Sequence, residues 1–390
     1  MIDELARRRR VRMSRAAGPA LLSALLFAGR LTTPPAALAQ ATSPPEGSQK
    51  EDRGTDAFRP KLIFLPFVYY TPETKLALGA GGVLNFRAGK NKALTRTSTV
   101  WIFGNYTLAK QFQVSVVPQV YFEKNSVYLS GNLRYERTPQ RFYGIGNDTP
   151  SSLMESYTPR IALFQAGLKK KLLGSLYAGL LLDLEQTNME SVEPGGILET
   201  AGIPGSRGGL VSGAGISFDW DTRDNVQFPR HGSFFQLAAR AYGPVLGSEF
   251  AFSSLNLDFR KYASPASGQV LALQAVLRLT SGDTPFYRLS MLGGDSLLRG
   301  YYKGRFRDKD MIVVQAEYRV SLGRRFGAAG FAGLGQVFPR FSDLELQSLR
   351  YSMGTGLRYS LNPREGTNIR MDLAWGVRSF GLYFTAQESF

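Results

Sequence analysis

The stretch 293–302 reads Gly-Gly-Asp-Ser-Leu-Leu-Arg-Gly-Tyr-Tyr and separates two runs in which apolar and polar residues alternate, 269–280 and 312–322. Glycine gives the backbone the freedom that a sharply folded loop needs. Arg299, near the centre of the stretch, carries a planar fork of donors that can bind a buried carboxylate. A Gly-rich connection of this kind is ordinarily exposed to solvent. The strands on either side decide whether it can instead fold into the inside of a barrel.

The two flanking runs have the period of β-strands with one apolar face. In 312–322 the residues Ile312, Val314 and Tyr318 share one face, and Glu317 and Arg319 share the other. A soluble sandwich would turn its apolar face inward. A membrane barrel is favoured here because the runs of about 10 to 14 residues suit tilted membrane crossings. Aromatic residues also lie near the ends of the apolar faces, and the acidic and basic residues on the other faces suit a hydrated lumen.

The alternating segments number about sixteen, and even strand numbers are usual in bacterial barrels. If both chain ends lie in the periplasm, the long connections 138–156, 188–208 and 282–309 all point outward, whereas several connections on the other side are short. We therefore predict an all-β fold: a transmembrane antiparallel β-barrel of about sixteen strands with an inward-folded sixth extracellular loop. The last predicted strand is 380–390.

The N-terminal part has the features of an export signal. A basic segment is followed by the apolar run 17–28 and by Ala37-Leu38-Ala39, a small-x-small cleavage site. The apolar run is too short to span a bilayer as an anchor. We predict a signal peptide over 1–39, a disordered periplasmic leader over 40–59 and an outer-membrane β-barrel over 60–390.

Composition restricts the chemistry. Cysteine is absent and His231 is the single histidine, so thiolate sites and a catalytic histidine pair are excluded and no enzymatic activity is expected. Asp219, Asp221 and Asp224 lack the spacing of a calcium loop and are typical of turn capping. We expect no metal and no cofactor. Removal of 1–39, which holds seven Lys or Arg and two Asp or Glu, leaves a net charge of about +11. After export, the anionic partners are membrane lipids and lipopolysaccharide rather than nucleic acid.

Several motifs carry a family resemblance. Gly294, Leu298, Arg299, Gly300 and Tyr301 resemble the sixth-loop motif of the BamA/TamA outer-membrane assembly superfamily, also called the bacterial surface antigen family. The segment 220–232, with Asp221, Arg223, Asp224, Pro229 and Gly232, resembles its central turn, and 316–319, 354–358 and 370–372 resemble its last barrel strands. Together these motifs span about 60–390. The order and spacing of the motifs are more specific than any one of them.

The resemblance implies that acidic side chains of neighbouring strands hold the loop arginine. The segment 331–335 resembles a family motif whose third residue is usually Asp, but this chain has Gly333. Glu317 and Asp372 point into the lumen by strand parity, and they are the expected partners of Arg299. The family's assembly factors also carry tandem periplasmic POTRA domains, for which 40–59 leaves no room.

The ends of the barrel suggest a weak seam. Pro66 in the first strand cannot donate to a ladder, and Gly381 and Phe390 belong to the last strand. The resemblance implies a lateral gate there, and the terminal Phe390 resembles the signal that the outer-membrane assembly machinery reads when it inserts a barrel. A further segment, 142–147, alternates aromatic and Gly residues in the third outer loop. It either packs on the barrel rim or forms an external lid or recognition surface.

Two functions remain open. The first is insertion or translocation of outer-membrane proteins or lipids during membrane biogenesis, with outer-membrane proteins as possible clients. The second is a passive pore or structural surface barrel without assembly activity.

Overall fold

The computed structural model describes residues 60–390 apart from 72–74, 91, 109 and 363–366. These residues belong to one compact unit, 57–390. The signal peptide predicted over 1–39 and the leader predicted over 40–59 lie outside the described residues.

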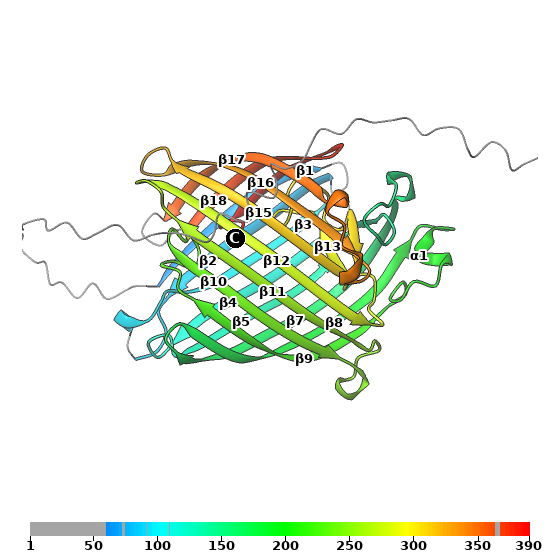
Figure 1. The fold of residues 1–390 in the computed structure, drawn as a ribbon, viewed down its shortest axis with the longest axis horizontal. Helices are drawn as coiled ribbons and strands as arrows, with labels where there is room; N and C mark the ends of the chain where they lie inside the picture. The colour runs from blue at the N-terminus through cyan, green and yellow to red at the C-terminus, as the bar shows by residue number, and fades with distance from the viewer. Residues whose placement is uncertain (1–59, 72–74, 91, 109, 363–366) are drawn as a thin grey trace, which may run out of the picture. The chain divides into compact units, whose positions relative to one another are not determined.

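The unit is built on a 17-stranded sheet in which sixteen long strands follow one another as antiparallel neighbours (Figure 1). The predicted count of about sixteen strands is confirmed. The remaining strand of this sheet, β6, and the separate pair β13 and β14 belong to outer loops. The strands are β1 (Lys61–Thr71), β2 (Lys75–Phe86), β3 (Ser98–Thr107), β4 (Phe112–Phe122), β5 (Val127–Arg137), β6 (Gln140–Phe142), β7 (Glu155–Leu173), β8 (Leu176–Val192), β9 (Gly208–Asp221), β10 (Gly232–Tyr242), β11 (Phe252–Ala263), β12 (Gln269–Gly282), β13 (Ser290–Leu292), β14 (Phe306–Asp308), β15 (Asp310–Ser321), β16 (Phe326–Phe338), β17 (Arg350–Asn362), β18 (Thr367–Gly376) and β19 (Ser379–Ala386).

Helical structure is limited to short turns in the connections. The only α-helical segment among the described residues is α1 (Ile197–Thr200), and the 3-10 turns are Lys92–Leu94, Ser151–Leu153, Pro244–Leu246, Phe341–Asp343 and Leu346–Ser348. In the described part of the chain, no helix has the length and apolar character that a membrane span needs.

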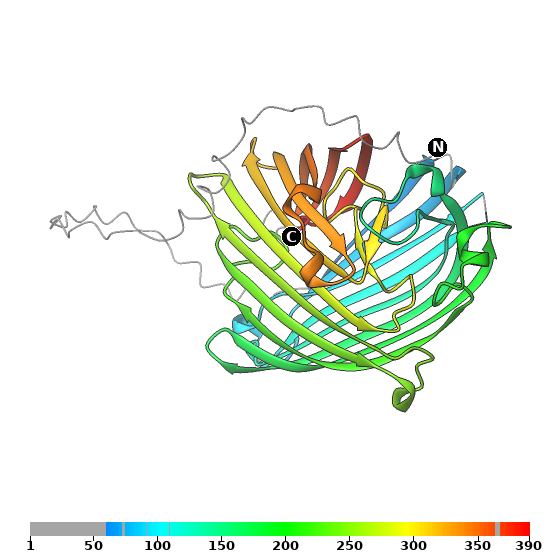
Figure 2. The ribbon, with the colours of Figure 1, turned by 45° about the vertical axis from the view of Figure 1, so that its right-hand side comes forward.

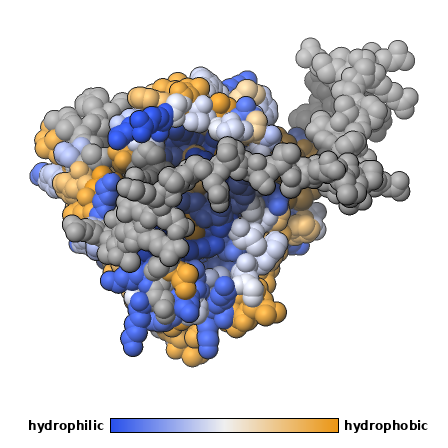
Figure 3. Space-filling model, turned by 90° about the vertical axis from the view of Figure 1, so that its left-hand side faces the viewer, coloured by the Kyte–Doolittle hydropathy of each residue, from blue (hydrophilic) through white to orange (hydrophobic). Residues whose placement is uncertain are grey.

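The wall has an apolar outer face and a polar inner face. In β8, Leu180, Leu182 and Leu184 are 67%, 55% and 43% exposed, whereas Asp183 and Glu185 are 3% and 5% exposed. Charged residues are therefore buried and leucines are exposed, the reverse of a soluble sheet. Figure 3 shows the end of the barrel opposite α1, where hydrophilic residues line a hollow and hydrophobic residues gather on the outer wall. This arrangement fits a lipid-facing wall around an aqueous lumen.

The longest connections gather at one end of the barrel, on the right of Figure 1. They are the third outer loop (138–154), the fourth (193–207) and the sixth (283–309), as expected from the sequence. The sixth loop, which contains β13 and β14, runs inside the ring of strands (Figure 2). Its Leu292, Leu298, Tyr301 and Phe306 pack with lumen-facing wall residues in a buried apolar cluster completed by Val276, Met311, Val313 and Val337. Loop six thus supplies the principal apolar core of the interior.

The end of the chain departs from the prediction. The last strand ends at Ala386 and not at residue 390. Gln387 has a left-handed backbone (φ 67°), which turns the chain out of the ladder. Phe390 is consequently 4% exposed and packs with Tyr262 and Ala272 inside the barrel. The prediction that Phe390 lies on the lateral seam is wrong, because the left-handed turn carries it inward.

The first and last strands lie toward the same side of the ring in Figure 2. Pro66 of β1 stands opposite Ala80 of β2, and Gly381 of β19 stands opposite Ala374 of β18. Among the described residues, no register of paired residues joins β1 to β19. Both residues therefore belong to strands with a pairing partner on one side only in the described structure.

Candidate functional site

The loop-six motif, Gly294–Tyr301, is seated closely against the wall. Gly300 has a φ of 110°, and a Cβ atom there would lie 2.7 Å from the carbonyl carbon of Trp375 at the end of β18. Only glycine combines that backbone conformation with so close an approach. Leu298 also adopts a positive φ of 53°, although it is not a glycine. This strained conformation places Leu298 and Arg299 on the lumen wall.

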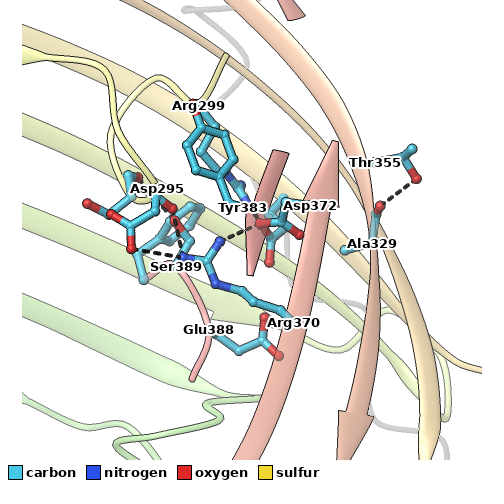
Figure 4. Close-up of polar contacts among 12 residues, drawn as sticks. Asp295, Arg299, Ala329, Thr355, Arg370, Asp372, Tyr383, Glu388 and Ser389 are labelled. Atoms are coloured by element: carbon cyan, nitrogen blue, oxygen red, sulfur yellow. Dashed lines mark hydrogen bonds and ion pairs between the residues drawn. The ribbon is translucent and has the colours of Figure 1, made fainter. Parts of the chain in front are cut away.

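Arg299 is held by two carboxylates from different strands, one of which, Asp372, lies near it in Figure 4. Its Nη1 donates to Oδ2 of Asp372 in β18 at 2.6 Å, and its Nη2 donates to Oε2 of Glu317 in β15 at 2.5 Å. The side chain of Arg299 is 1% exposed, and those of both carboxylates are 0% exposed. The structure thus brings together the three residues that parity and resemblance nominated. Because a buried guanidinium without a carboxylate would be costly, the two acids are what permit it to lie there.

The two carboxylates are shared among four arginines. Arg319 Nε donates to Glu317 at 2.7 Å, Arg358 Nη1 donates to Asp372 at 2.6 Å, and Arg370 Nη1 also contacts Asp372. A third acid, Glu388, accepts from Arg358 Nε at 2.9 Å. We call these seven residues the ion cluster: Arg299, Glu317, Arg319, Arg358, Arg370, Asp372 and Glu388.

The ion cluster has four positive and three negative side chains, so its formal charge is about +1. Two of the spare donors are directed at main-chain oxygens. Arg370 Nη2 donates to the carbonyl of Asp295 in loop six at 2.7 Å, and Arg319 Nη2 donates to the carbonyl of Phe390 at 2.8 Å. The cluster therefore binds both loop six and the segment after β19.

Aromatic side chains complete the seat of loop six. The Arg299 guanidinium lies 3.4 Å from the ring centre of Phe331 in β16, within cation–π range. The hydroxyl of Tyr383 in β19 accepts from Gly300 N at 2.9 Å and donates to the Tyr301 carbonyl at 3.2 Å. Tyr301 in turn donates its hydroxyl to the Tyr351 carbonyl at 2.8 Å. Loop six is therefore bound by β15, β16, β17, β18 and β19 together.

Gly333 explains how loop six docks on the wall without the aspartate that the family motif usually has. A Cβ atom at Gly333 would lie 3.3 Å from Cδ1 of Leu298 and 3.0 Å from Cβ of Gln315. Leu298 occupies the space above this glycine, and Gln315 accepts from Leu298 N at 3.2 Å. The small residue makes room for loop six, and the carboxylates come from β15 and β18 instead.

The third outer loop lies on the other side of loop six. Gly146 N donates to the Arg307 carbonyl at 2.7 Å, and Phe142, which is 0% exposed, packs edge-on against Phe286 with ring centres 5.3 Å apart. Arg305 donates to the side-chain and main-chain oxygens of Thr149 at 2.9 and 2.7 Å. The aromatic and glycine residues of 142–147 are thus a packing surface for loop six.

Loop six makes a second ion pair with the wall. Arg288 donates to Glu185 of β8 at 2.9 Å and to Asp183 of the same strand at 2.5 Å. Burial alone would lower the pKa of the Arg288 guanidinium, but the two carboxylates more than offset that effect and raise its pKa. Arg288 therefore stays charged and anchors the start of loop six.

The turn motif at the opposite end is also an ion pair. Asp221 accepts from Arg223 Nε at 2.9 Å and from Arg96 Nη1 at 2.9 Å, so its carboxylate is more than a turn cap. Asp224 does cap the turn, because its Oδ1 accepts from the backbone of Asn225, Arg230 and His231. At Gly232, with φ 101°, a Cβ atom would lie 2.3 Å from the Thr222 carbonyl oxygen. Pro229 lies inside this turn. Across the described ranges, no group of three or more His, Asp or Glu residues is arranged to hold a metal ion.

The sequence did not predict Arg319, Arg358, Arg370, Tyr383 or Glu388 as residues of the site. Strand parity could have found Tyr383, since it stands opposite Asp372 in the β18–β19 register and its neighbours Leu382 and Phe384 face outward. Strand parity could not have found Glu388, because this residue reaches the ion cluster only after the chain has left the β18–β19 ladder at Gln387.

Comparison with known proteins agrees with this geometry. The model of the Omp85 superfamily domain matches residues 77–390. The chain belongs to the Omp85 superfamily. No curated protein matches the sequence of this Omp85 chain.

Solved structures show the same fold. BamA from Haemophilus ducreyi lacking POTRA domains 1–3 superimposes with a TM-score of 0.53 at 16% identity, over 84% of this chain and 69% of that one. CdiB from Escherichia coli superimposes with a TM-score of 0.52 at 11% identity, over 84% of this chain and 61% of that one. CdiB from Acinetobacter baumannii superimposes with a TM-score of 0.51 at 11% identity, over 84% of this chain and 59% of that one. The protein is thus an outer-membrane β-barrel of the Omp85 superfamily, similar in fold to BamA and CdiB.

Proposed function

We propose that this Omp85 barrel inserts or translocates outer-membrane proteins or lipids and does not act as an open pore. The observation that carries the proposal is the seating of loop six across the lumen by Arg299, Glu317 and Asp372. Two charge-assisted hydrogen bonds in a fully buried site hold loop six firmly inside the barrel. A loop held this firmly in the lumen suits a machine that opens on demand.

The proposed route is the seam between β1 and β19. Pro66 weakens the edge of β1 because it has no N–H to donate. Client outer-membrane proteins, membrane lipids and lipopolysaccharide are the partners that suit a lipid-facing seam. Neither a catalytic role nor a cofactor forms part of the proposal: His231 is exposed in the turn 222–231.

Depletion of the protein in its own bacterium, followed by quantification of outer-membrane proteins and lipids, tests the proposal. We expect the levels of several barrels or the lipid asymmetry to fall before growth stops. Unchanged levels of every barrel and lipid would overturn it and favour the structural barrel.

Cross-linking tests the seam. Cysteine pairs placed between β1 and β19 in this cysteine-free chain should block function when oxidised, and reduction should restore it. The control pair is Leu373→Cys with Leu382→Cys, which stand opposite each other within the β18–β19 ladder. Oxidised seam pairs that leave function intact would contradict a lateral route.

The alternative, a passive pore, makes a different prediction in planar bilayers. A plugged barrel should conduct weakly and intermittently, and Arg299→Ala should raise its conductance. A large steady conductance of the unmodified protein would favour the pore.

A further inference from the structure

A chamber of about 870 Å³ lies in the lumen between loop six and the wall strands β4, β5, β7, β8, β10, β11 and β12. We call it the luminal chamber. It lies on the side of loop six that bears Lys303, and none of the arginines of the ion cluster lines it. Its walls carry both acidic and basic side chains, so the pairing of these charges decides what the chamber can hold.

Two of the basic side chains are matched by acids. Arg288 is paired with Asp183 and Glu185, and Arg134 lies 3.6 Å from Glu136. Arg134 and Glu136 cancel, whereas Arg288 with its two acids keeps a formal charge of −1, and the carboxylate of Asp295 also lines the chamber.

Three other cations of the chamber are unmatched. Arg240 of β10, Arg278 of β12 and Lys303 of loop six have no carboxylate within 4 Å in the described structure. Arg278 donates its Nε to the neutral Oδ1 of Asn256 at 3.1 Å, and the Nε of Arg240 is buried without a hydrogen-bond partner. Elsewhere in the lumen, Lys169 and Arg260 each have an aspartate. Arg240, Arg278 and Lys303 instead face one cavity.

The absence of a carboxylate partner for these three cations points to an anion from solution. Like charges that share a water-filled cavity of low-dielectric walls repel each other and concentrate counter-ions. Three positive charges are best neutralised by a multiply charged anion, and a phosphate monoester carries about −1.5 to −2 at pH 7. Guanidinium forks match the oxygens of phosphate, which accept in a bidentate manner. The volume leaves room for a small group attached to the phosphate.

We propose that the luminal chamber is a binding site for a small soluble phosphate-bearing anion, held by Arg240, Arg278 and Lys303. This site is separate from the seam and from the ion cluster that holds loop six. The proposal of a phosphate site can therefore be tested independently of the proposed function. Because the chamber is enclosed by the wall and by loop six, a soluble anion reaches it more directly than the headgroup of a lipid.

The test uses the full-length folded protein in neutral detergent, titrated calorimetrically with inorganic phosphate at constant ionic strength set by chloride. We expect saturable binding of one phosphate per chain. Arg240→Gln with Arg278→Gln should weaken that binding at least tenfold, since each removes a charge-assisted hydrogen bond. Arg324→Gln, an exposed cation in the turn 322–325, should leave it unchanged.

A second variant protects the test against misfolding. Lys303→Gln changes an exposed residue of loop six rather than the wall, and it should also weaken phosphate binding in a barrel that keeps its heat-modifiable migration. Non-saturable binding, or equal binding by the wild-type chain and both chamber variants, would overturn the proposal. In nanodiscs, binding that persists in phosphatidylglycerol as in phosphatidylcholine supports the soluble source. Loss in phosphatidylglycerol alone would overturn it in favour of a lipid headgroup.

Discussion

Replacement of Arg299 by alanine should release loop six from the wall. The guanidinium makes two charge-assisted hydrogen bonds, worth about 1.5–3 kcal/mol each, and a buried cation–π contact worth about 2 kcal/mol. Glu317 keeps Arg319 and Arg358 after the change, and Asp372 keeps Arg358 and Arg370. No carboxylate is left unpaired, so the loss falls at the lower end of the ~3–5 kcal/mol typical of a broken buried pair.

A loss of about 3 kcal/mol shifts the balance between docked and undocked loop six roughly a hundredfold, since 1.4 kcal/mol is a factor of ten. Leu298→Cys reports that balance, because residue 298 is 0% exposed when loop six is docked and the chain has no other cysteine. Maleimide should label this cysteine about a hundredfold faster when Arg299→Ala is added. Labelling is measured on barrels that retain heat-modifiable migration in gels.

Two further variants sharpen the test. Arg299→Lys keeps the charge but loses the fork, and it should accelerate labelling by about tenfold. Arg324→Ala removes an exposed cation from the turn 322–325 and should have no effect. Equal labelling rates with and without Arg299 would refute the view that the ion cluster holds loop six.

Two glycines give further predictions. Gly376→Ala would place a Cβ atom 2.4 Å from the Tyr301 ring and should weaken docking by about 1–3 kcal/mol, whereas Gly330→Ala meets nothing within 4 Å and should be close to neutral; the same labelling assay compares them. Gly333→Asp, which restores the acid usual in the family motif, should also weaken docking by about 1–3 kcal/mol because its side chain would meet Leu298; tighter docking would contradict this packing account.

Much of the barrel could be predicted because a strand has a period of two. Once the wall strands are in register, each side chain faces either lipid or lumen, and that parity placed Glu317 and Asp372 inside before any contact was known. The same rule failed after Ala386. The apolar face of Phe380, Leu382, Phe384 and Ala386 is interrupted by Glu388 before Phe390. The backbone turns left-handed at Gln387, a non-glycine residue with no sequence signal for that conformation.

Contacts between loops could not be predicted from the sequence for a different reason. Aromatic and glycine residues at 142–147 were compatible with rim packing or with a lid, and only the closure of the strands determines what lies opposite them. The structure places Phe142 against Phe286 and Gly146 against Arg307, both in loop six. Such pairing depends on the position of strands far apart in the chain, which periodicity does not encode.

The origin of the contacts on loop six has a consequence for the seam. β19, the strand at one edge of the seam, contributes the Tyr383 hydroxyl to Gly300 N and Tyr301 O, and its Ser379 hydroxyl donates to the Gly300 carbonyl at 2.6 Å. Glu388, which follows β19, belongs to the ion cluster that holds Arg299. Movement of β19 away from β1 would break these three hydrogen bonds, at about 1 kcal/mol each, unless loop six moved with it. We therefore expect opening of the proposed seam and release of loop six to be energetically coupled by about 3 kcal/mol, so that each makes the other easier.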